Sequence, residues 1–145
     1  MSDVDLKDRA GFRVWTSDTI RYSDLDPNNH VNNGAINTYF EDGRVHFRDQ
    51  HLSHLGAGML AGFVLVKYNI EYHAMLYFPG EAEIGTTIIR IGGSSYTLGQ
   101  AVFRDARCIA TAQVITVRMS EGSGRSMPLD DAFKQALRDA TGFAA

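Results

Sequence analysis

A short polar segment, residues 23–33, concentrates the side chains that could do chemistry in this chain. It reads SDLDPNNHVNN, and a helical pattern begins directly after it. The N-terminus of a helix presents unpaired amides and about half a positive charge, which suits an oxygen that gains negative charge during a reaction. A carboxylate a few residues upstream reaches the same carbon as a nucleophile, or through a water as a base. Both halves of a site for cleaving an acyl compound such as a thioester therefore fit in this loop; a capping loop without chemistry is the alternative of equal weight.

Metal binding by the same loop is disfavoured by the spacing of its ligands. Asp24, Asp26 and Asn28 match the first three ligands of an EF-hand loop, but the sixth and twelfth places hold asparagine and alanine instead of glycine and glutamate. A zinc site from the two aspartates and His30 lacks any HxxxH or CxxC spacing. We therefore expect no metal site and no metal cofactor.

The segment after the loop, residues 34–52, follows the helical period. Its apolar stripe comprises Ile36, Tyr39, Phe40, Gly43 and Phe47. Asn32 or Asn33 is suited to cap the helix start, because an asparagine side chain accepts from the free amides of the first turn. Such a helix of roughly five turns, ~27 Å at 1.5 Å per residue, needs a sheet to cover its stripe.

Extended segments supply that sheet. The clearest period-2 pattern covers residues 63–78, where the even positions are apolar. The expected elements in chain order are a loose N-terminal arm over 1–10, one strand or two short ones within 12–22, four strands at 63–78, 81–91, 95–104 and 107–118, and a short helix over 128–141 that Pro128 opens. Four sequential strands joined by tight turns predict an antiparallel meander, and the whole pattern predicts an α+β domain with the sheet curled around the long helix.

Length and charge exclude several classes of function. The 145 residues fit one domain, 1–145, and a net charge of −3 gives no reason to bind nucleic acid or an anionic membrane. The only cysteine, Cys108, lies in a strand-like segment and is interpreted as a small buried hydrophobe. No stretch approaches the ~18 apolar residues of a membrane span and the N-terminus does not look like a signal peptide, so we expect a cytoplasmic protein.

The loop and helix together resemble a known signature. The segment RYSDLDPNNHVNNGAINTYFEDGR is similar to that of hotdog-fold thioesterases of the 4-hydroxybenzoyl-CoA thioesterase-like family, and DLDPNNHVNN also resembles the loop of plant acyl-ACP thioesterases. The resemblance covers about residues 12–140 and implies the hotdog fold, with an antiparallel sheet wrapped around a long central helix. Many relatives have glycine where this chain has Asn29; asparagine tolerates a left-handed backbone, so we expect the loop shape to survive.

The resemblance also implies site residues. The catalytic aspartate of the family falls on Asp26, and the helix-end amide that polarises the thioester carbonyl falls on Asn33 or Gly34. In the acyl-ACP branch an asparagine and a histidine of the loop assist, and these match Asn28 and His30. Pantetheine or nucleotide contacts in relatives fall near Ser94 and Ser95, where a simple turn is equally compatible with the sequence.

The resulting hypothesis is a homodimeric or homotetrameric enzyme that hydrolyses an acyl-CoA to free acid and CoA. No cofactor is expected beyond the coenzyme A of the substrate. Two alternatives stay open: a thioesterase for acyl-carrier-protein substrates, and a non-catalytic acyl-CoA-binding module on the same fold.

Overall fold

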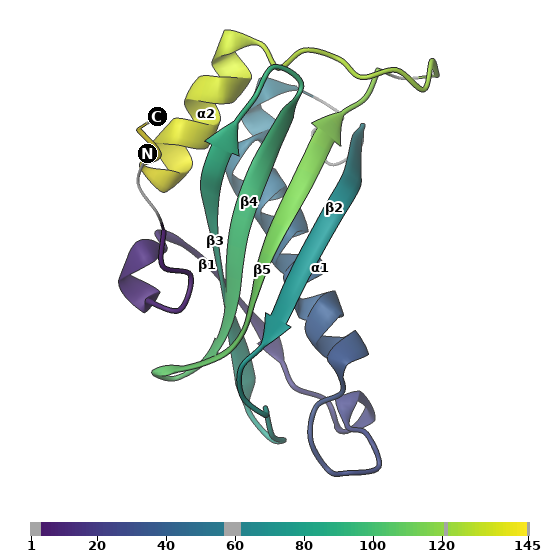
Figure 1. Cartoon of the computed structure of the whole chain (residues 1–145), viewed down its shortest axis with the longest axis vertical. Coiled ribbons are helices and arrows are strands. Elements are labelled where there is room, and N and C mark those ends of the chain that lie inside the picture. Colours follow the sequence, from purple (N-terminus) through teal and green to yellow (C-terminus); the bar gives the residue numbers. More distant parts are fainter. Residues whose placement is uncertain (1–3, 57–61, 121, 145) are drawn as a thin grey trace.

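A computed structural model describes residues 4–56, 62–120 and 122–144 of the chain (Figure 1). Five strands, two α-helices and three short 3-10 turns occur in this part. In chain order they are η1 (Arg9–Gly11), β1 (Val14–Thr19), η2 (Tyr22–Asp24), α1 (Asn33–His51), η3 (Ser53–Leu55), β2 (Phe63–Tyr72), β3 (Glu81–Ile91), β4 (Ser95–Arg104), β5 (Arg107–Arg118) and α2 (Asp131–Thr141). In the described part of the chain, no helix is long and apolar enough to cross a membrane.

The five strands form one antiparallel sheet in the order β1-β3-β4-β5-β2, with α1 across one face (Figure 1). This confirms the α+β architecture of a sheet around a long helix. The simple meander is wrong, because β2 pairs with β5 and not with β3. The strand predicted over 63–78 is also too long, because β2 ends at Tyr72. The chain then leaves the sheet, and the carbonyl of Leu76 accepts a hydrogen bond from the amide of Val31. β2 thus becomes an edge strand.

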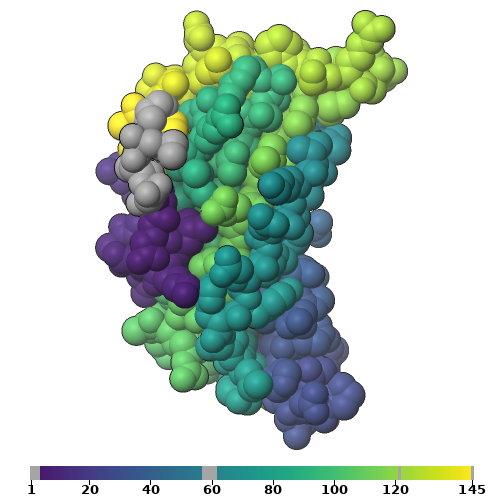
Figure 2. Space-filling model, viewed as in Figure 1, coloured from purple at the N-terminus to yellow at the C-terminus, as the bar shows by residue number. Residues whose placement is uncertain are grey.

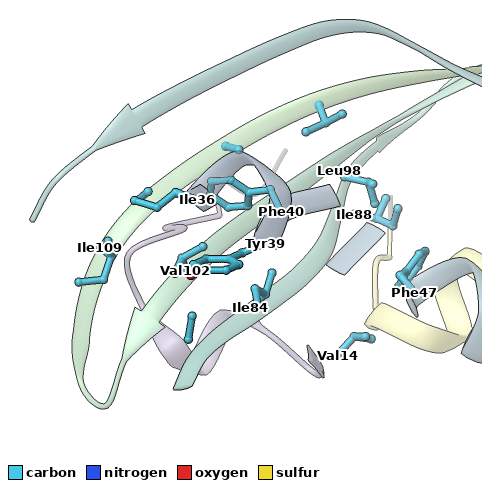
Figure 3. Packing of buried hydrophobic residues seen from close by; sticks show 14 of the residues in the cluster. Val14, Ile36, Tyr39, Phe40, Phe47, Ile84, Ile88, Leu98, Val102 and Ile109 are labelled. Carbon is cyan, nitrogen blue, oxygen red and sulfur yellow. The ribbon is translucent and has the colours of Figure 1, made fainter. Parts of the chain in front are cut away.

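Helix α1 contacts the sheet through the stripe predicted from its sequence. Ile36, Tyr39, Phe40 and Phe47 are each 2% exposed or less, and they pack against apolar side chains of β3, β4 and β5 (Figure 3). The helix starts where expected, because the Asn32 side chain accepts a 2.7 Å hydrogen bond from the amide of Ala35. The apolar stripe and the cap together fix where the helix begins and which face it buries.

Strand β2 changes the face it presents to α1 partway along its length. The ladder with β5 shifts by one residue at Val66, which is a β-bulge. Before the bulge Phe63 stacks on Phe133 of α2, with ring centroids 5.6 Å apart; after it Tyr68 packs edge-on to Phe40 of α1. The even positions therefore face the core only from residue 68 onward, because a one-residue shift exchanges the two faces of a strand.

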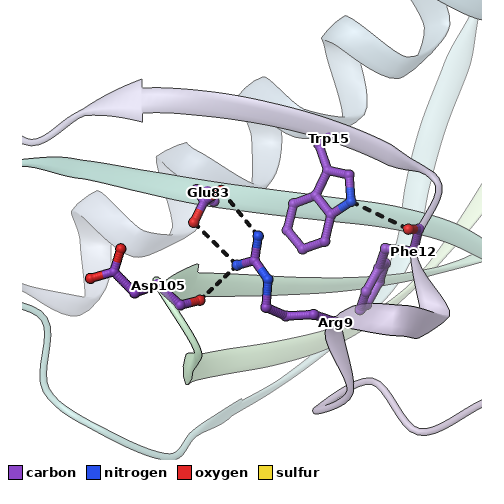
Figure 4. Close-up of polar contacts among 5 residues, drawn as sticks. All are labelled: Arg9, Phe12, Trp15, Glu83 and Asp105. Atoms are coloured by element: carbon purple, nitrogen blue, oxygen red, sulfur yellow. Dashed lines mark hydrogen bonds and ion pairs between the residues drawn. The ribbon is translucent and has the colours of Figure 1, made fainter.

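Segments near both ends of the described chain pack against the sheet; residues 1–3 of the expected arm lie outside the described residues. The arm expected over residues 1–10 is anchored at Arg9, whose guanidinium is 3.1 Å from the Glu83 carboxylate and lies 4.5 Å from the centre of the Trp15 ring (Figure 4). Helix α2 begins at residue 131, three residues later than expected from Pro128, because the Asp130 side chain accepts from the amide of Phe133 and caps it there.

Candidate active site

The loop before α1 folds into a tight turn around Asp26. The amide of Asp26 donates to the carbonyl of His30 at 2.9 Å, and the Asp26 carbonyl accepts from the amide of Asn29 at 3.0 Å. Asn29 adopts a φ of 65°, the left-handed conformation expected of it. The flanking residues Leu25 and Val31 form a β-bridge that closes the base of the turn. The backbone thus holds residues 26–30 in one defined conformation.

The Asp26 carboxylate has two neighbours, both in this turn. Its Oδ1 accepts a 2.8 Å hydrogen bond from the amide of Asn28, and its Oδ2 lies 3.3 Å from Nδ1 of His30. The two side chains are 22% and 25% exposed, so both are accessible to a small molecule. The His30 ring thus faces the Asp26 carboxylate through Nδ1. Asn28 contacts the Asp26 carboxylate through its backbone amide.

The other aspartate of the loop has a different environment. Oδ2 of Asp24 accepts a 2.6 Å hydrogen bond from the Tyr39 hydroxyl and a 2.9 Å bond from the amide of Arg21. Burial, followed by the hydrogen bond to Asp24, raises the pKa of Tyr39 above its ordinary value, so this phenol stays a donor. Asp24 therefore joins η2 to α1.

The first amides of α1 are available to a ligand. Asn32 caps the helix through the amide of Ala35, whereas the amides of Asn33 and Gly34 take part in no hydrogen bond within the part of the chain that the structure describes. Both residues are accessible to solvent. The helix end thus keeps two donors and the positive end of its dipole free for an oxyanion.

A cavity of about 300 Å³ opens beside these groups. His30, Asn33 and Ile36 line one side, and the chain leaving β2, residues 72–76, lines the other. In Figure 2 this chain (teal) lies against the surface formed by the start of α1 (blue). Asp26 is next to the cavity through its contact with His30. The cavity joins a carboxylate–imidazole pair to a helix N-terminus, which suits acyl transfer to water.

The wall from β2 adds two residues that were not predicted as part of the site. The Tyr72 hydroxyl donates a 3.1 Å hydrogen bond to Oδ1 of Asn37 on α1, and Nε2 of His73 lies 2.9 Å from Oγ1 of Thr111. In the sequence His73 shares the polar odd positions with Lys67, Asn69 and Glu71, a pattern that suits a cleft wall, a partner interface or a solvated sheet face equally. His73 is far from the loop in the sequence, so its place in the wall of this cavity was not predicted.

Ser94 and Ser95 lie far from this cavity within one chain. Ser95 pairs with Val117 near the end of β5, whereas Tyr72 pairs with Ala110 near its start. Seven residues along β5 separate the two positions, about 23 Å at 3.3 Å per residue. The structure does not bring these serines to the loop; Ser94 uses its carbonyl to accept from the amide of Arg118.

The loop residues considered as metal ligands are not assembled for one. Across residues 4–56, 62–120 and 122–144, no three His, Cys, Asp or Glu side chains are grouped closely enough to hold a metal ion. Asp24 is directed to Tyr39, away from the Asp26–His30 contact. The prediction that the reaction uses no metal stays a prediction.

Asp18 and Asp42 form a pair of neighbouring carboxyl groups close to the loop. Burial, with the neighbouring Asp42 carboxyl adding to it, raises the pKa of Asp18 to about 7. Arg21 opposes this rise and Asp24 adds slightly to it. Oδ2 of Asp18 is buried without a hydrogen-bond partner in the described structure. The β1–α1 contact therefore favours a protonated Asp18 below neutral pH.

A comparison of the chain with known protein families identifies the superfamily to which it belongs. The model of the thioesterase-like superfamily matches residues 20–137. No curated protein sequence matches the chain.

Solved structures share the fold over most of its length. A thioesterase from Thermus thermophilus, complexed with coenzyme A and Zn, is 26% identical with a TM-score of 0.81, covering 93% of this chain and 98% of its own. A predicted thioesterase from Bacillus stearothermophilus is 24% identical with a TM-score of 0.79, covering 88% and 95%. A hypothetical protein from Staphylococcus aureus in complex with CoA is 16% identical with a TM-score of 0.78, covering 89% and 84%.

Proposed function

Because this chain belongs to the thioesterase-like superfamily, we propose that it hydrolyses an acyl-CoA to a free carboxylic acid and CoA. The observation that carries the proposal is the pairing of the Asp26 carboxylate with His30 beside a cavity that the free end of α1 also lines. A carboxylate and an oxyanion donor beside one cavity are what hydrolysis of a thioester needs.

In the proposed reaction the thioester carbonyl oxygen points at the amides of Asn33 and Gly34. Asp26 either attacks the carbonyl carbon itself or removes a proton from an attacking water. The helix-end amides stabilise the negative oxygen of the tetrahedral intermediate, which collapses and expels the CoA thiolate. If Asp26 is the base, the attacking water supplies the hydroxyl of the acid and, through Asp26, the proton of the CoA thiol. If Asp26 is the nucleophile, the collapse leaves a mixed anhydride on Asp26; a water then hydrolyses this anhydride, which releases the acid, restores the Asp26 carboxylate and supplies the proton of the CoA thiol. His30 orients Asp26, or orients the water through Nε2, the nitrogen that does not face the carboxylate.

Coenzyme A as the carrier is supported by two of the structural neighbours, which were solved with CoA bound. An acyl-carrier-protein thioester is the alternative carrier, and both present the same pantetheine thioester. We propose no further cofactor. The Thermus protein was solved with Zn as well as CoA, so the test is an assay after chelation and desalting, in which full hydrolysis is expected. Activity that vanishes and returns with zinc or magnesium would overturn the metal-free mechanism.

The test of the function is a screen of short, long and aromatic acyl-CoAs, with thiol release followed directly. Hydrolysis that Asp26→Asn removes is the expected result. A protein that binds acyl-CoA by calorimetry and releases no thiol from any of them would instead be the non-catalytic binding module. Hydrolysis of acyl-ACP with no hydrolysis of the matched acyl-CoA would select the alternative carrier.

A further inference from the structure

A second cavity, of about 180 Å³, lies between α1 and the start of β2. Arg44 and Arg48 line it from the helix, and Phe63, Leu65 and Thr116 line it from the sheet. The first cavity lies between the same two elements, at Ile36 of α1 and Tyr72 of β2. Since β2 runs opposite to α1, the two cavities mark two ends of one helix–strand boundary.

Neither arginine of this cavity has an acidic partner in the part of the chain that the structure describes. Arg44 is 8% exposed; its guanidinium donates to Gln100 Oε1 at 3.2 Å and lies 5.1 Å from the centre of the Tyr68 ring. Arg48 lies 5.6 Å from the Phe63 ring centre, and its Nε is buried with no hydrogen-bond partner. Among the described residues, no carboxylate oxygen lies within 4.0 Å of either guanidinium.

Glu41 also lines the cavity, and its spacing from Arg44 would suit an ion pair on one face of the helix. Its side chain is exposed, however, and it forms an ion pair with neither arginine in the described structure. One negative and two positive side chains therefore surround the cavity, which leaves one positive charge unbalanced there. Neutral amides and aromatic rings offset only part of the cost of burying a guanidinium, and a carboxylate offsets it much better.

Two tyrosine hydroxyls lie next to the same arginines. Burial raises the pKa of the Tyr68 and Tyr96 phenols, whereas Arg44 beside Tyr68 and Arg48 beside Tyr96 oppose that rise by their charge and by hydrogen bonding. These phenols are next to the arginines and do not line the cavity, so only the two guanidiniums are directed to an occupant. Two guanidiniums at one cavity, with no carboxylate partner among the described residues, suit an anion.

We propose that this second cavity receives a carboxylate at the far end of the acyl chain, which makes the preferred substrates CoA thioesters of medium-chain dicarboxylic acids. This inference rests on the proposed thioesterase function. Asn33 and Arg44 are eleven residues apart, about 16 Å along the helix at 1.5 Å per residue. Helical side chains lean toward the N-terminus, so the guanidinium lies nearer, roughly 12 Å from the helix end. An extended chain advances about 1.2 Å per bond, so eight to ten carbons, roughly, span that distance.

The experiment compares two CoA thioesters of equal length, decanoyl-CoA and its 9-carboxynonanoyl counterpart, by kcat/KM. We expect the carboxylated substrate to be favoured at least about tenfold, the worth of one good charge-assisted contact. Arg48→Gln should bring that ratio close to one, and Arg44→Gln should do the same if it folds. Arg138→Gln, on α2 outside the cavity, is the matched control and should keep the ratio. A wild-type ratio near one, or a ratio that Arg48→Gln leaves unchanged, would overturn the proposal.

A binding measurement separates this inference from the proposed function. Sebacate and decanoate are titrated calorimetrically into the Asp26→Asn variant, which needs no turnover. Tighter binding of sebacate, weakened by Arg48→Gln, supports the carboxylate site even in a protein that hydrolyses nothing. Equal binding of sebacate and decanoate rejects the site even when thioesters are hydrolysed. Equal binding is also the result expected if a carboxylate from a second copy of the chain fills the cavity.

Discussion

The Tyr39 hydroxyl donates a 2.6 Å hydrogen bond to Oδ2 of Asp24, which ties the first aspartate of the loop to the second turn of α1. Asp26, two residues later, contacts only groups of its own turn, namely the amide of Asn28 and the ring of His30. Two carboxylates that look equivalent in the sequence are therefore different in kind. Asp24 joins structural elements, whereas Asp26 keeps lone pairs that the proposed reaction would use.

Asp26→Asn should keep the fold and lower kcat by about a thousandfold or more, because the amide retains the shape but supplies neither nucleophile nor base. Asp24→Asn is the matched control. It weakens the bond from Tyr39 and should lower the free energy of unfolding by about 1–2 kcal/mol while kcat stays within roughly tenfold. Thiol-release kinetics and urea unfolding measure both. Equal losses of kcat in the two variants would contradict the assignment.

His30→Gln should lower kcat by about a hundredfold, because the ring that orients Asp26 or a water is lost. His46→Gln, at an exposed position on α1, is the control and should change nothing measurable. Steady-state kinetics on the best acyl-CoA decides this. A His30→Gln enzyme within a few-fold of wild type would leave Asp26 to act without the imidazole.

Asp18→Asn should stabilise the protein at pH 8 and have little effect near pH 4. In the folded chain the pKa of Asp18 is raised to about 7 from an ordinary 3.8, chiefly by burial. The folded state therefore holds a proton that the unfolded state has lost, so wild-type stability falls as pH rises from about 4 to 7. After allowance for solvent screening, the gain is about 1 kcal/mol, or roughly 3 °C in Tm. Thermal melting across this pH range measures the effect. If the Tm of the wild type and the Tm of the variant change in parallel with pH, the prediction is wrong.

Gly43→Ala should destabilise the protein by about 1–3 kcal/mol, although alanine is the better helix former by about 1 kcal/mol. A Cβ at this position would lie 2.7 Å from Cγ2 of Ile84 and 3.0 Å from Nε2 of Gln100. Gln100 also donates to the Phe40 carbonyl at 3.1 Å, so it has little freedom to move. Chemical denaturation measures the loss. Combining Gly43→Ala with Ile84→Ala should cost less than the sum of the two, because the second change makes room for the first.

A homodimer or homotetramer is the expected state in solution. β2 lies at the edge of the sheet, and Val64 and Val66 on it are 46% and 58% exposed. An unpaired edge with apolar side chains favours pairing with a symmetry mate. Light scattering at micromolar concentration should give at least twice the 16.0 kDa of the chain. A mass of one chain would contradict this.

The parts of the fold that depend on local sequence were predicted, and so was the antiparallel pairing of β3, β4 and β5, whose strands follow one another through tight turns. The place of β2 in the sheet was not predicted. The stripe of α1 and its Asn32 cap follow from spacing within a few residues, as does the left-handed Asn29. The position of β2 depends on which distant strand it meets, and its bulge at Val66 has no signal in the alternation of residue types. His73 was missed as a wall of the site for the same reason.

The pairing of β2 with β5 also sets an order of events during synthesis. Phe63 of β2 pairs with Arg118, so the strand can be completed only after some 55 further residues have left the ribosome. Until then the nascent chain carries the complete sequence of the Asp26 loop and of α1, but β2 is not held in place as the opposite wall of either cavity and this apolar strand is unpaired. A chain truncated before β5 should therefore be prone to aggregate, and the enzyme's chemistry waits for one of its last elements.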